Sequence, residues 1–236
     1  MHVELLPLLR CLRPHVDAPL IVAVGSSVDR RIMTGTLGCS VCGAEYAIAD
    51  GNAVFETLPA GSTAMGEVVG GVVASIAGGA SEGRASERHS DAPDDGAMRL
   101  AALITLDDRE GVWVLDGRWA GMAAALGTIV PATFLLLADR SVASDWPALV
   151  GAGDVVPLAS ASVRGFVLDH PSAALATSAA RILVTGGRLV APAATPVPAG
   201  VRELARDARQ WAGEREPAAH AGPLVTPRRA TPRTGN

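Results

Sequence analysis

Two cysteines separated by two residues, Cys39 and Cys42, most constrain how this chain can fold. Gly43 follows them, and a glycine lets the backbone turn sharply after the second thiolate, as in a zinc knuckle. A closed structural zinc site needs four ligands. The remaining cysteine, Cys11, lies upstream, and His15 follows it at a spacing typical of zinc-ligand pairs. The sequence therefore predicts a zinc site of Cys11, His15, Cys39 and Cys42. The alternative is a pair of small buried thiols with a solvent-exposed histidine.

The residues around these ligands favour β-structure. Residues 20–24 form an apolar run rich in β-branched side chains, which predicts a strand. Asp-Gly at 50–51 separates two further β-prone runs, and this pattern is a strong hairpin signal. Strands, hairpin and two ligand pairs together predict a zinc ribbon over residues 1–57.

The second knuckle and the hairpin after it resemble the Trm112-like zinc-ribbon family. The segment CSVCGAEYAIADGNAVF matches the family pattern at Cys39, Cys42, Tyr46, Ile48, Asp50 and Gly51. Ser40 and Ala47 stand where the family has proline, and Cys11 and His15 stand where it has Cys-x-x-Cys. Members of the family assist a methyltransferase as a separate small partner or precede a methyltransferase domain in one chain. The resemblance therefore implies a protein partner or a second, methyltransferase-like half.

From residue 98 onward, helix-like and strand-like segments alternate. Apolar runs that carry an acidic residue at or next to their ends predict buried parallel strands at 111–116, 133–139 and 164–170. Helices are expected at 98–106, 121–126 and 173–182, and a further strand at 188–192 after the Gly186-Gly187 turn. Residues 201–216 are compatible with a helix or a terminal hairpin, and the alternation of Trp211 with charged residues favours the hairpin. Alternation of this kind predicts a parallel sheet with right-handed crossovers.

This half resembles a class I S-adenosylmethionine-dependent methyltransferase. The resemblance is carried by GDVVPLASASVRGFVLDH followed by ARILVTGGRLVAP, in the order and spacing of the family. It implies an α/β fold class: a small N-terminal zinc ribbon plus a Rossmann-like, methyltransferase-type parallel sheet. The expected division is a Trm112-like zinc ribbon at 1–57, a Gly/Ala/Ser-rich helix and linker at 58–97, a methyltransferase-like domain at 98–216, and a disordered Pro/Arg-rich tail at 217–236.

The loop expected to hold the cofactor departs from the family pattern. In methyltransferases the loop after the first strand reads Asp-x-Gly-x-Gly-x-Gly, and its bare backbone lets the methionine part of the cofactor approach closely. The resemblance places Asp116, Gly117 and Gly121 in this loop. Only two glycines remain, the loop is shorter, and Arg118 and Trp119 put bulk where the cofactor would lie. This composition argues against ordinary S-adenosylmethionine binding.

Two further acids match family positions for the cofactor. Asp139 ends the second strand, where a carboxylate accepts hydrogen bonds from the ribose hydroxyls, and Asp154 matches the acid that contacts the adenine amino group. The alternative is that both are ordinary loop acids at strand ends. Asp169-His170 suggests acid–base chemistry, although a polar cap on a buried strand is the simpler interpretation.

Composition excludes several classes of protein. The net charge of −4 gives no reason to expect a general nucleic-acid binder. Three cysteines are too few for a disulfide framework. The first residues lack a signal-peptide pattern, and no apolar run reaches the ~20 residues of a membrane span. We therefore expect a cytoplasmic protein that does not enter a membrane.

These observations lead to one main hypothesis and two alternatives. The main hypothesis is a methyltransferase-family protein with a degenerate cofactor loop, a pseudoenzyme that acts with a protein partner as a non-catalytic binding or scaffold subunit. The first alternative is an active S-adenosylmethionine-dependent methyltransferase of unknown substrate. The second is a zinc-ribbon nucleic-acid binder that uses Arg228, Arg229 and Arg233, which the negative net charge makes the weakest of the three.

Overall fold

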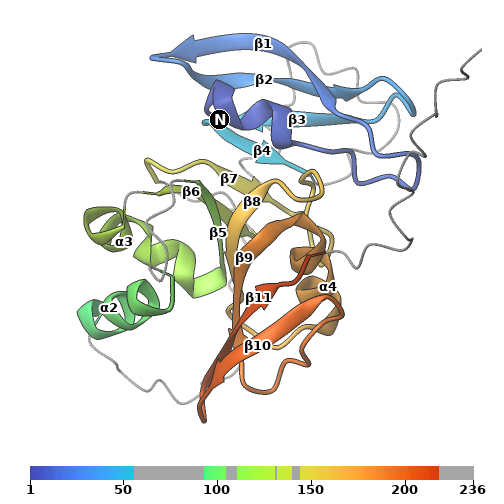
Figure 1. The fold of residues 1–236 in the computed structure, drawn as a ribbon. Coiled ribbons are helices and arrows are strands. Elements are labelled where there is room, and N and C mark those ends of the chain that lie inside the picture. Colours follow the sequence, from blue (N-terminus) through green and yellow to red (C-terminus); the bar gives the residue numbers. More distant parts are fainter. Residues whose placement is uncertain (56–92, 105–110, 131, 140–143, 218–236) are drawn as a thin grey trace, which may run out of the picture.

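The computed structural model describes residues 1–55, 93–104, 111–130, 132–139 and 144–217 (Figure 1). The strands are β1 (Leu20–Val28), β2 (Arg31–Cys39), β3 (Glu45–Ala49), β4 (Asn52–Val54), β5 (Val112–Asp116), β6 (Thr133–Ala138), β7 (Ala148–Val150), β8 (Val163–Val167), β9 (Leu183–Pro192), β10 (Val201–Arg206) and β11 (Gln210–Arg215). The helices are η1 (Val3–Leu8) and η2 (Gly117–Met122), both 3-10, and α2 (Pro93–Ile104), α3 (Ala123–Ile129) and α4 (Ala173–Ile182). Within the described residues, the strands form one sheet in the order β1-β2-β3-β4-β7-β6-β5-β8-β9-β11-β10.

The first four strands are antiparallel neighbours along the chain. The β3–β4 hairpin predicted from the sequence is confirmed, with Ala49 paired to Asn52 across the turn. Both turn residues have positive φ, 50° at Asp50 and 78° at Gly51. This is the turn geometry that matches the natural twist of a two-residue hairpin, and Asp-Gly adopts it readily.

The second part of the sheet is parallel from β7 to β9 and has a doubly wound order. Within this part, the first strand along the chain is β5, in the middle. The chain then moves outward to β6 and β7, and returns to β8 and β9 on the other side of β5. The last two strands add an antiparallel hairpin, β10–β11, beyond β9. The predicted fold class is confirmed: antiparallel N-terminal strands with a cysteine cluster precede a Rossmann-like α/β sheet. The neighbouring carboxyl ends of β5 and β8 mark its switch point.

Local differences from the predicted elements have identifiable causes. Strand β9 begins at Leu183, directly after α4, and Gly186 lies within it with a φ of 76°. The expected turn at Gly186-Gly187 is instead an irregularity inside the strand, where the register against β8 shifts. Strand β7 has only three residues and was not predicted. The helix expected at 121–126 is preceded by the 3-10 turn η2.

The two parts of the sheet are joined edge to edge. Strand β4 pairs in parallel with β7, and Phe55 N–H continues the ladder by donating to the Val150 carbonyl at 2.7 Å. Asn52 Oδ1 accepts a hydrogen bond from the Ala148 amide at 3.0 Å. The predicted linker, 58–97, lies outside the described residues up to residue 92, as does the predicted tail from residue 218. The division into domains therefore stays a prediction, while the described strands form a continuous sheet.

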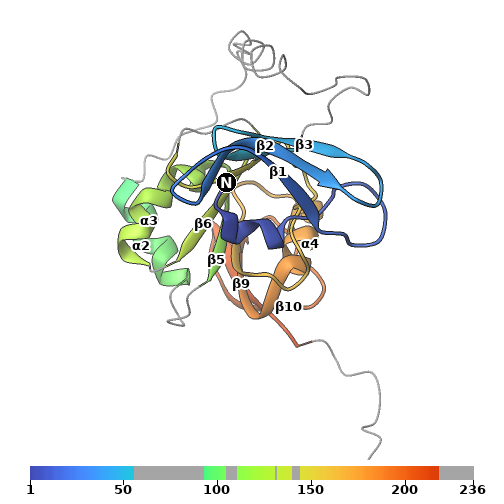
Figure 2. The ribbon, with the colours of Figure 1, turned by 90° about the horizontal axis from the view of Figure 1, so that it is seen from above.

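Two apolar clusters lie on the two faces of this sheet. In Figures 1 and 2, α2 and α3 lie on one face of the parallel strands and α4 lies on the other. The cluster on the α4 side contains residues from the N-terminal strands, such as Leu37 and Tyr46, together with Leu149 and Leu158. The N-terminal part therefore shares a hydrophobic core with the parallel sheet. None of the described helices is long and apolar enough to cross a membrane.

Candidate metal centre and cofactor loop

The four predicted zinc ligands come together at one end of the N-terminal strands. The ligand atoms of Cys11, His15, Cys39 and Cys42 all lie within 4.8 Å of one another. Cys39 is the last residue of β2, and Cys42 follows it in the turn toward β3. Gly43 in this turn has a φ of 69° and donates its N–H to the Cys39 carbonyl at 2.9 Å. This is the sharp turn expected of a knuckle.

Two distances between ligand atoms in the cluster fit tetrahedral coordination of one metal ion. Cys11 Sγ lies 3.6 Å from Cys42 Sγ, and Cys39 Sγ lies 3.3 Å from His15 Nε2. Zinc bonds of about 2.3 Å to sulfur and about 2.0–2.1 Å to nitrogen, set at tetrahedral angles, give ligand separations of roughly 3.8 and 3.6 Å. The side chains are thus already spaced nearly as they would be around zinc.

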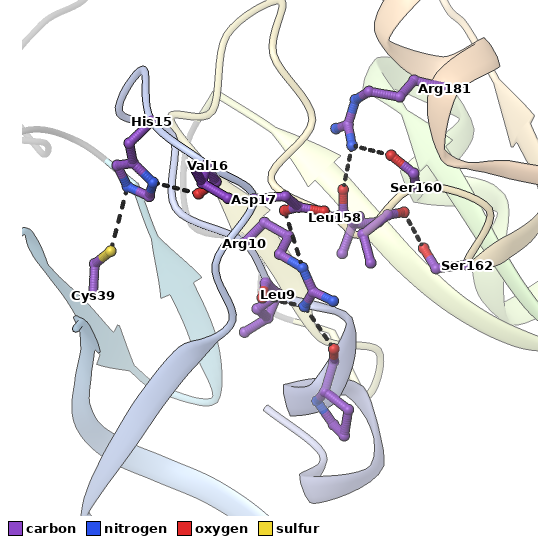
Figure 3. A network of polar contacts seen from close by, with 12 residues as sticks. Leu9, Arg10, His15, Val16, Asp17, Cys39, Leu158, Ser160, Ser162 and Arg181 are labelled. Atoms are coloured by element: carbon purple, nitrogen blue, oxygen red, sulfur yellow. Dashed lines mark hydrogen bonds and ion pairs between the residues drawn. The ribbon is translucent and has the colours of Figure 1, made fainter. Parts of the chain in front are cut away.

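A hydrogen bond to the backbone orients the histidine for metal binding. His15 Nδ1 lies 2.6 Å from the Val16 carbonyl oxygen. A carbonyl only accepts, so Nδ1 carries the proton, and in the neutral ring the Nε2 lone pair then faces Cys39. Metal-ligating histidines are commonly fixed in this way by a partner of the second nitrogen. Figure 3 shows this arrangement from Cys39 through His15 to Val16.

The pKa values of two neighbouring thiols, Cys11 and Cys42, are shifted in opposite directions. Burial opposes ionisation of Cys11, but the Tyr46 hydroxyl and the Arg13 amide bond its sulfur, and the pKa of Cys11 is lowered overall. The Ala44 amide lowers the pKa of Cys42, whereas burial and contact with Cys11 raise it, and the net shift is upward. Burial and the bond to Cys11 raise the pKa of Tyr46 to about 12. Metal binding needs thiolates, and the hydrogen bonds to Cys11 favour that form of its side chain.

Tyr46 was not predicted to take part in this site. Its hydroxyl contacts Cys11 Sγ at 3.3 Å and accepts the Leu12 amide at 3.2 Å, so it holds both the first ligand and the backbone directly after it. Tyr46 is one of the positions that carry the zinc-ribbon resemblance, and this match was the sequence feature that could have linked it to the metal site. The sequence pattern does not show which residue its hydroxyl reaches 35 positions away.

Polar contacts continue from the cluster to the parallel sheet (Figure 3). Asp17, two residues after His15, forms an ion pair with Arg10 at 3.1 Å. Leu9, next to Arg10, forms an isolated bridge with Leu158, and the Arg10 amide donates to the Pro157 carbonyl at 2.8 Å. On the far side, Arg181 of α4 donates to the Leu158 carbonyl at 2.8 Å. The cluster is therefore fixed against the parallel half.

At the other predicted site, the loop after β5 forms the short helix η2, which packs against the end of β8. Trp119 of η2 is 6 % exposed, and its indole N–H donates to the Leu168 carbonyl at 3.0 Å. The Arg118 amide and guanidinium bond the carboxylate of Asp169 at 3.0 and 2.8 Å. A side chain added at Gly117 would collide with Asp169. The loop is thus held tightly against the switch point.

Asp116 is buried at the end of β5 and is bonded to the loop after β8. It is 6 % exposed, and its Oδ2 accepts the Asp169 amide at 3.1 Å and lies 3.8 Å from His170 Nδ1. Burial raises the pKa of Asp116, and the neighbouring carboxylates of Asp169 and Asp139 add to that rise, while the Asp169 amide and His170 oppose it. The carboxylate at the end of β5 is therefore withdrawn from solvent and lies beside two further titratable residues, Asp169 and His170.

The remaining predicted cofactor residues follow the carboxyl ends of β5, β6 and β7. Asp139 follows β6, is exposed, and stands close enough to Asp116 to influence its ionisation. Asp154 follows β7 and accepts the Ser172 hydroxyl at 2.9 Å. Ser172 caps the N-terminus of α4 by accepting the Leu175 amide. Gly121 lies in η2, and no atom stands within 4 Å of where its side chain would begin.

No protein-family model matches the chain, and no curated protein matches it. The solved structures that it resembles include geranyl diphosphate C-methyltransferase from Streptomyces coelicolor A3(2), at 15% identity and a TM-score of 0.35. This likeness covers 41% of the present chain and 42% of that enzyme, so the chain spans about two fifths of the enzyme's length.

Two further solved structures also resemble parts of the chain. One chain of a complex that contains the Haloferax volcanii Trm112 methyltransferase activator is 14% identical, with a TM-score of 0.41, covering 53% of this chain and 95% of that one. The Burkholderia thailandensis 1,6-didemethyltoxoflavin-N1-methyltransferase is 13% identical, with a TM-score of 0.35, covering 54% and 63%.

Proposed function

We propose that this chain is a methyltransferase-fold protein that does not use S-adenosylmethionine and serves as a binding or scaffold subunit for a protein partner. The observation that carries this proposal is the packing of η2. Trp119 is buried in the apolar cluster under α2 and α3, and its N–H is bonded to Leu168. A cofactor at the carboxyl end of β5 needs the space and the bare backbone that this helix takes.

The ion pair between Arg118 and Asp169 supports the same conclusion. It bridges η2 to Asp169, the second residue after β8, across the switch point where doubly wound sheets bind their ligands. Admitting a nucleoside there would require breaking this pair, freeing Trp119 and leaving the Leu168 carbonyl without its donor. These costs add to those of binding and oppose it.

The second candidate is an active methyltransferase, and the acids at the strand ends favour it. Asp139 is exposed beyond β6, where it could accept ribose hydroxyls, and Asp154 lies beyond β7. A working enzyme of this kind would hold its cofactor with Asp116, Asp139 and Asp154 through an unusual loop, and η2 would then have to move from the packing described above. This function needs no glycine-rich loop, and the same experiment tests both candidates.

The experiment is calorimetric titration of the zinc-loaded protein with S-adenosylmethionine. We expect no binding up to about 1 mM cofactor, equivalent to a binding free energy weaker than about −4 kcal/mol. Micromolar affinity, about −8 kcal/mol, would overturn the proposal and favour the second candidate. In that case Asp139→Asn should weaken binding, with Glu203→Gln on the distant strand β10 as the matched control.

We further propose that Cys11, His15, Cys39 and Cys42 hold one structural zinc ion. A closed set of three thiolates and one imidazole leaves no open position for a substrate, so its contribution is to folding. Metal analysis of the purified protein should give one zinc per chain, and Cys39→Ser should lower this content strongly. Ser40→Ala, in the same turn and not a ligand, is the control. Equal zinc content in the wild type and the Cys39→Ser variant would remove the site.

A further inference from the structure

The first strand of the sheet, β1, has an open edge. It is the first strand in the sheet order and, among the described residues, pairs along its length with β2 only. Just before it, Pro19 forms an isolated bridge with Arg10, so the open stretch runs from about Leu20 to Val28. In Figures 1 and 2, β1 forms the rim of the N-terminal strands, away from the helices of the parallel half.

The backbone groups that face this open edge follow from the neighbouring strand. Cys39 directs its N–H to the Ala44 carbonyl and accepts the Gly43 amide with its own carbonyl, so its backbone faces β3. Its partner in β1 is Leu20. Because an antiparallel pair alternates between bonded and non-bonded positions, Leu20 turns its N–H and C=O away from β2, and Val22 and Val24 do the same. Edges of this kind are templates for another strand.

The composition of β1 leaves this template unprotected. Its sequence, LIVAVGSSV, contains no charge and no proline. Three of its side chains are large, apolar and exposed: Ile21 at 63 %, Val24 at 53 % and Val28 at 59 %. Natural sheets usually protect long apolar edges with lysine, proline, bulges or covering segments. Within β1, only the register shifts between Val24 and Ser27 serve this purpose.

The opposite edge of the same sheet shows the protection that β1 lacks. Strand β10 carries Arg202, Glu203 and Arg206, and its register shifts between Glu203 and Ala205. Arg206 and Glu203 form an ion pair at 2.7 Å along this strand. Leu204 is its one large exposed apolar side chain within the described residues, at 37 %. The contrast marks β1 as the edge available for pairing.

We propose that β1 pairs with β1 of a second copy of this chain, antiparallel and across a two-fold axis near Val24. The charges at its two ends favour this occupant. Asp17 precedes the strand and is paired with Arg10 at 3.1 Å, and Arg30 follows it and is paired with Glu4 at 2.6 Å. Each end therefore carries an ion pair within its own chain, so that antiparallel self-pairing brings no unpaired like charges of these ends together, and the uncharged strand meets itself without repulsion.

The expected dimer is weak. Pairing along one strand buries less than the roughly 1,200–2,000 Å² of a stable interface. A dissociation constant on the order of tens of micromolar is therefore expected, within the range that sedimentation velocity resolves. The inference does not depend on whether the protein binds S-adenosylmethionine, because β1 lies at the far side of the sheet from β5.

The test is sedimentation velocity of the full chain, zinc-loaded, from about 1 μM to about 1 mM, which spans weak dissociation constants. We expect a monomer–dimer transition in the wild type and at least a tenfold weaker dimer for Val24→Lys, because two like charges then meet across the axis. Leu204→Lys, on the opposite edge, should leave the dimer unchanged. An equimolar mixture of Val24→Lys and Val24→Glu should dimerise again, which a merely unfolded variant would not do.

Each outcome of this experiment either supports or overturns the proposed β1–β1 contact. Restored association in the mixed variants establishes the β1–β1 contact. A wild type that stays monomeric up to about 1 mM excludes a second copy as the occupant. A dimer that weakens with Leu204→Lys, or persists equally in Val24→Lys, places the interface elsewhere and also overturns the proposal. Circular dichroism and zinc content, measured on each variant, verify that the fold is retained.

Discussion

Trp119→Ala tests whether η2 is part of the folded core or a loop that moves aside for a ligand. Trp119 lies on η2 among buried residues of α2, α3 and β5, and its ring is 6 % exposed. Its N–H supplies the bond to the Leu168 carbonyl at 3.0 Å. Removing the side chain therefore leaves both a cavity and a carbonyl without its donor.

The magnitude follows from these two losses. Truncation of a buried tryptophan costs about 3–5 kcal/mol. Trp119→Phe keeps most of the ring and loses the donor, so it should cost about 1–3 kcal/mol. Arg118→Ala breaks an ion pair whose arginine is 67 % exposed, and should cost less than about 1 kcal/mol. The loss in free energy of unfolding should therefore be largest for Trp119→Ala, smaller for Trp119→Phe and smallest for Arg118→Ala.

The assay is urea unfolding monitored by the circular dichroism of the backbone, a signal that does not depend on Trp119. With an m-value of about 3 kcal/mol/M, the loss in Trp119→Ala corresponds to a midpoint about 1–1.7 M lower. If this variant unfolds within about 0.3 M of the wild type, the ring contributes little to the core, and η2 is a loop that can open for a cofactor. That result would refute the argument made from its packing.

Three further changes test other contacts. Asp116→Asn keeps an acceptor for the Asp169 amide and removes a buried charge. Because burial raises the folded-state pKa of Asp116, its ionisation costs stability once the pH exceeds the ordinary carboxyl value. The variant should therefore melt higher than the wild type at pH 8 and lose this advantage toward pH 4; the reverse trend would contradict the assignment. Arg181→Ala removes the donor to the Leu158 carbonyl and one of the two donors to the Val156 carbonyl, which still accepts the Leu158 amide. It should lower the free energy of unfolding by about 1–3 kcal/mol, measured by urea unfolding, and an effect below about 0.5 kcal/mol would count against it. Tyr46→Phe should retain zinc but release it to a chelator faster than the wild type, and an unchanged release rate would show that its hydroxyl does not support the site.

Local patterns in the sequence predicted those elements whose signals lie within a few residues. The β3–β4 hairpin follows from Asp-Gly between β-prone runs, and α4 spans the predicted residues 173–182. The runs at β5, β6 and β8 also formed the expected strands, because a buried parallel strand is continuously apolar. The spacing of cysteines and histidine likewise indicated which four side chains would meet, and the structure brings them together.

Contacts between distant residues could not be predicted in this way. Strand β7 has three residues, too few for a periodic signal, yet it joins the two parts of the sheet through Ala53 and Leu149. The bulk of Trp119 was recognised as an obstacle, but the carbonyl that it bonds lies 49 positions away. The open edge of β1 is a property of the strand order, and no local pattern shows which strand of a sheet is last.

The joined sheet makes the metal centre relevant to the whole fold. The segment before the first ligand is tied to the parallel half by two backbone bonds, from the Arg10 amide to the Pro157 carbonyl at 2.8 Å and from the Ala159 amide to the Leu8 carbonyl at 2.7 Å. A zinc ion that fixes Cys11 and His15 would restrain this segment from its other end. Its free energy of binding would then stabilise the contacts at residues 157–159 as well as the N-terminal strands, since both contribute to one hydrophobic core.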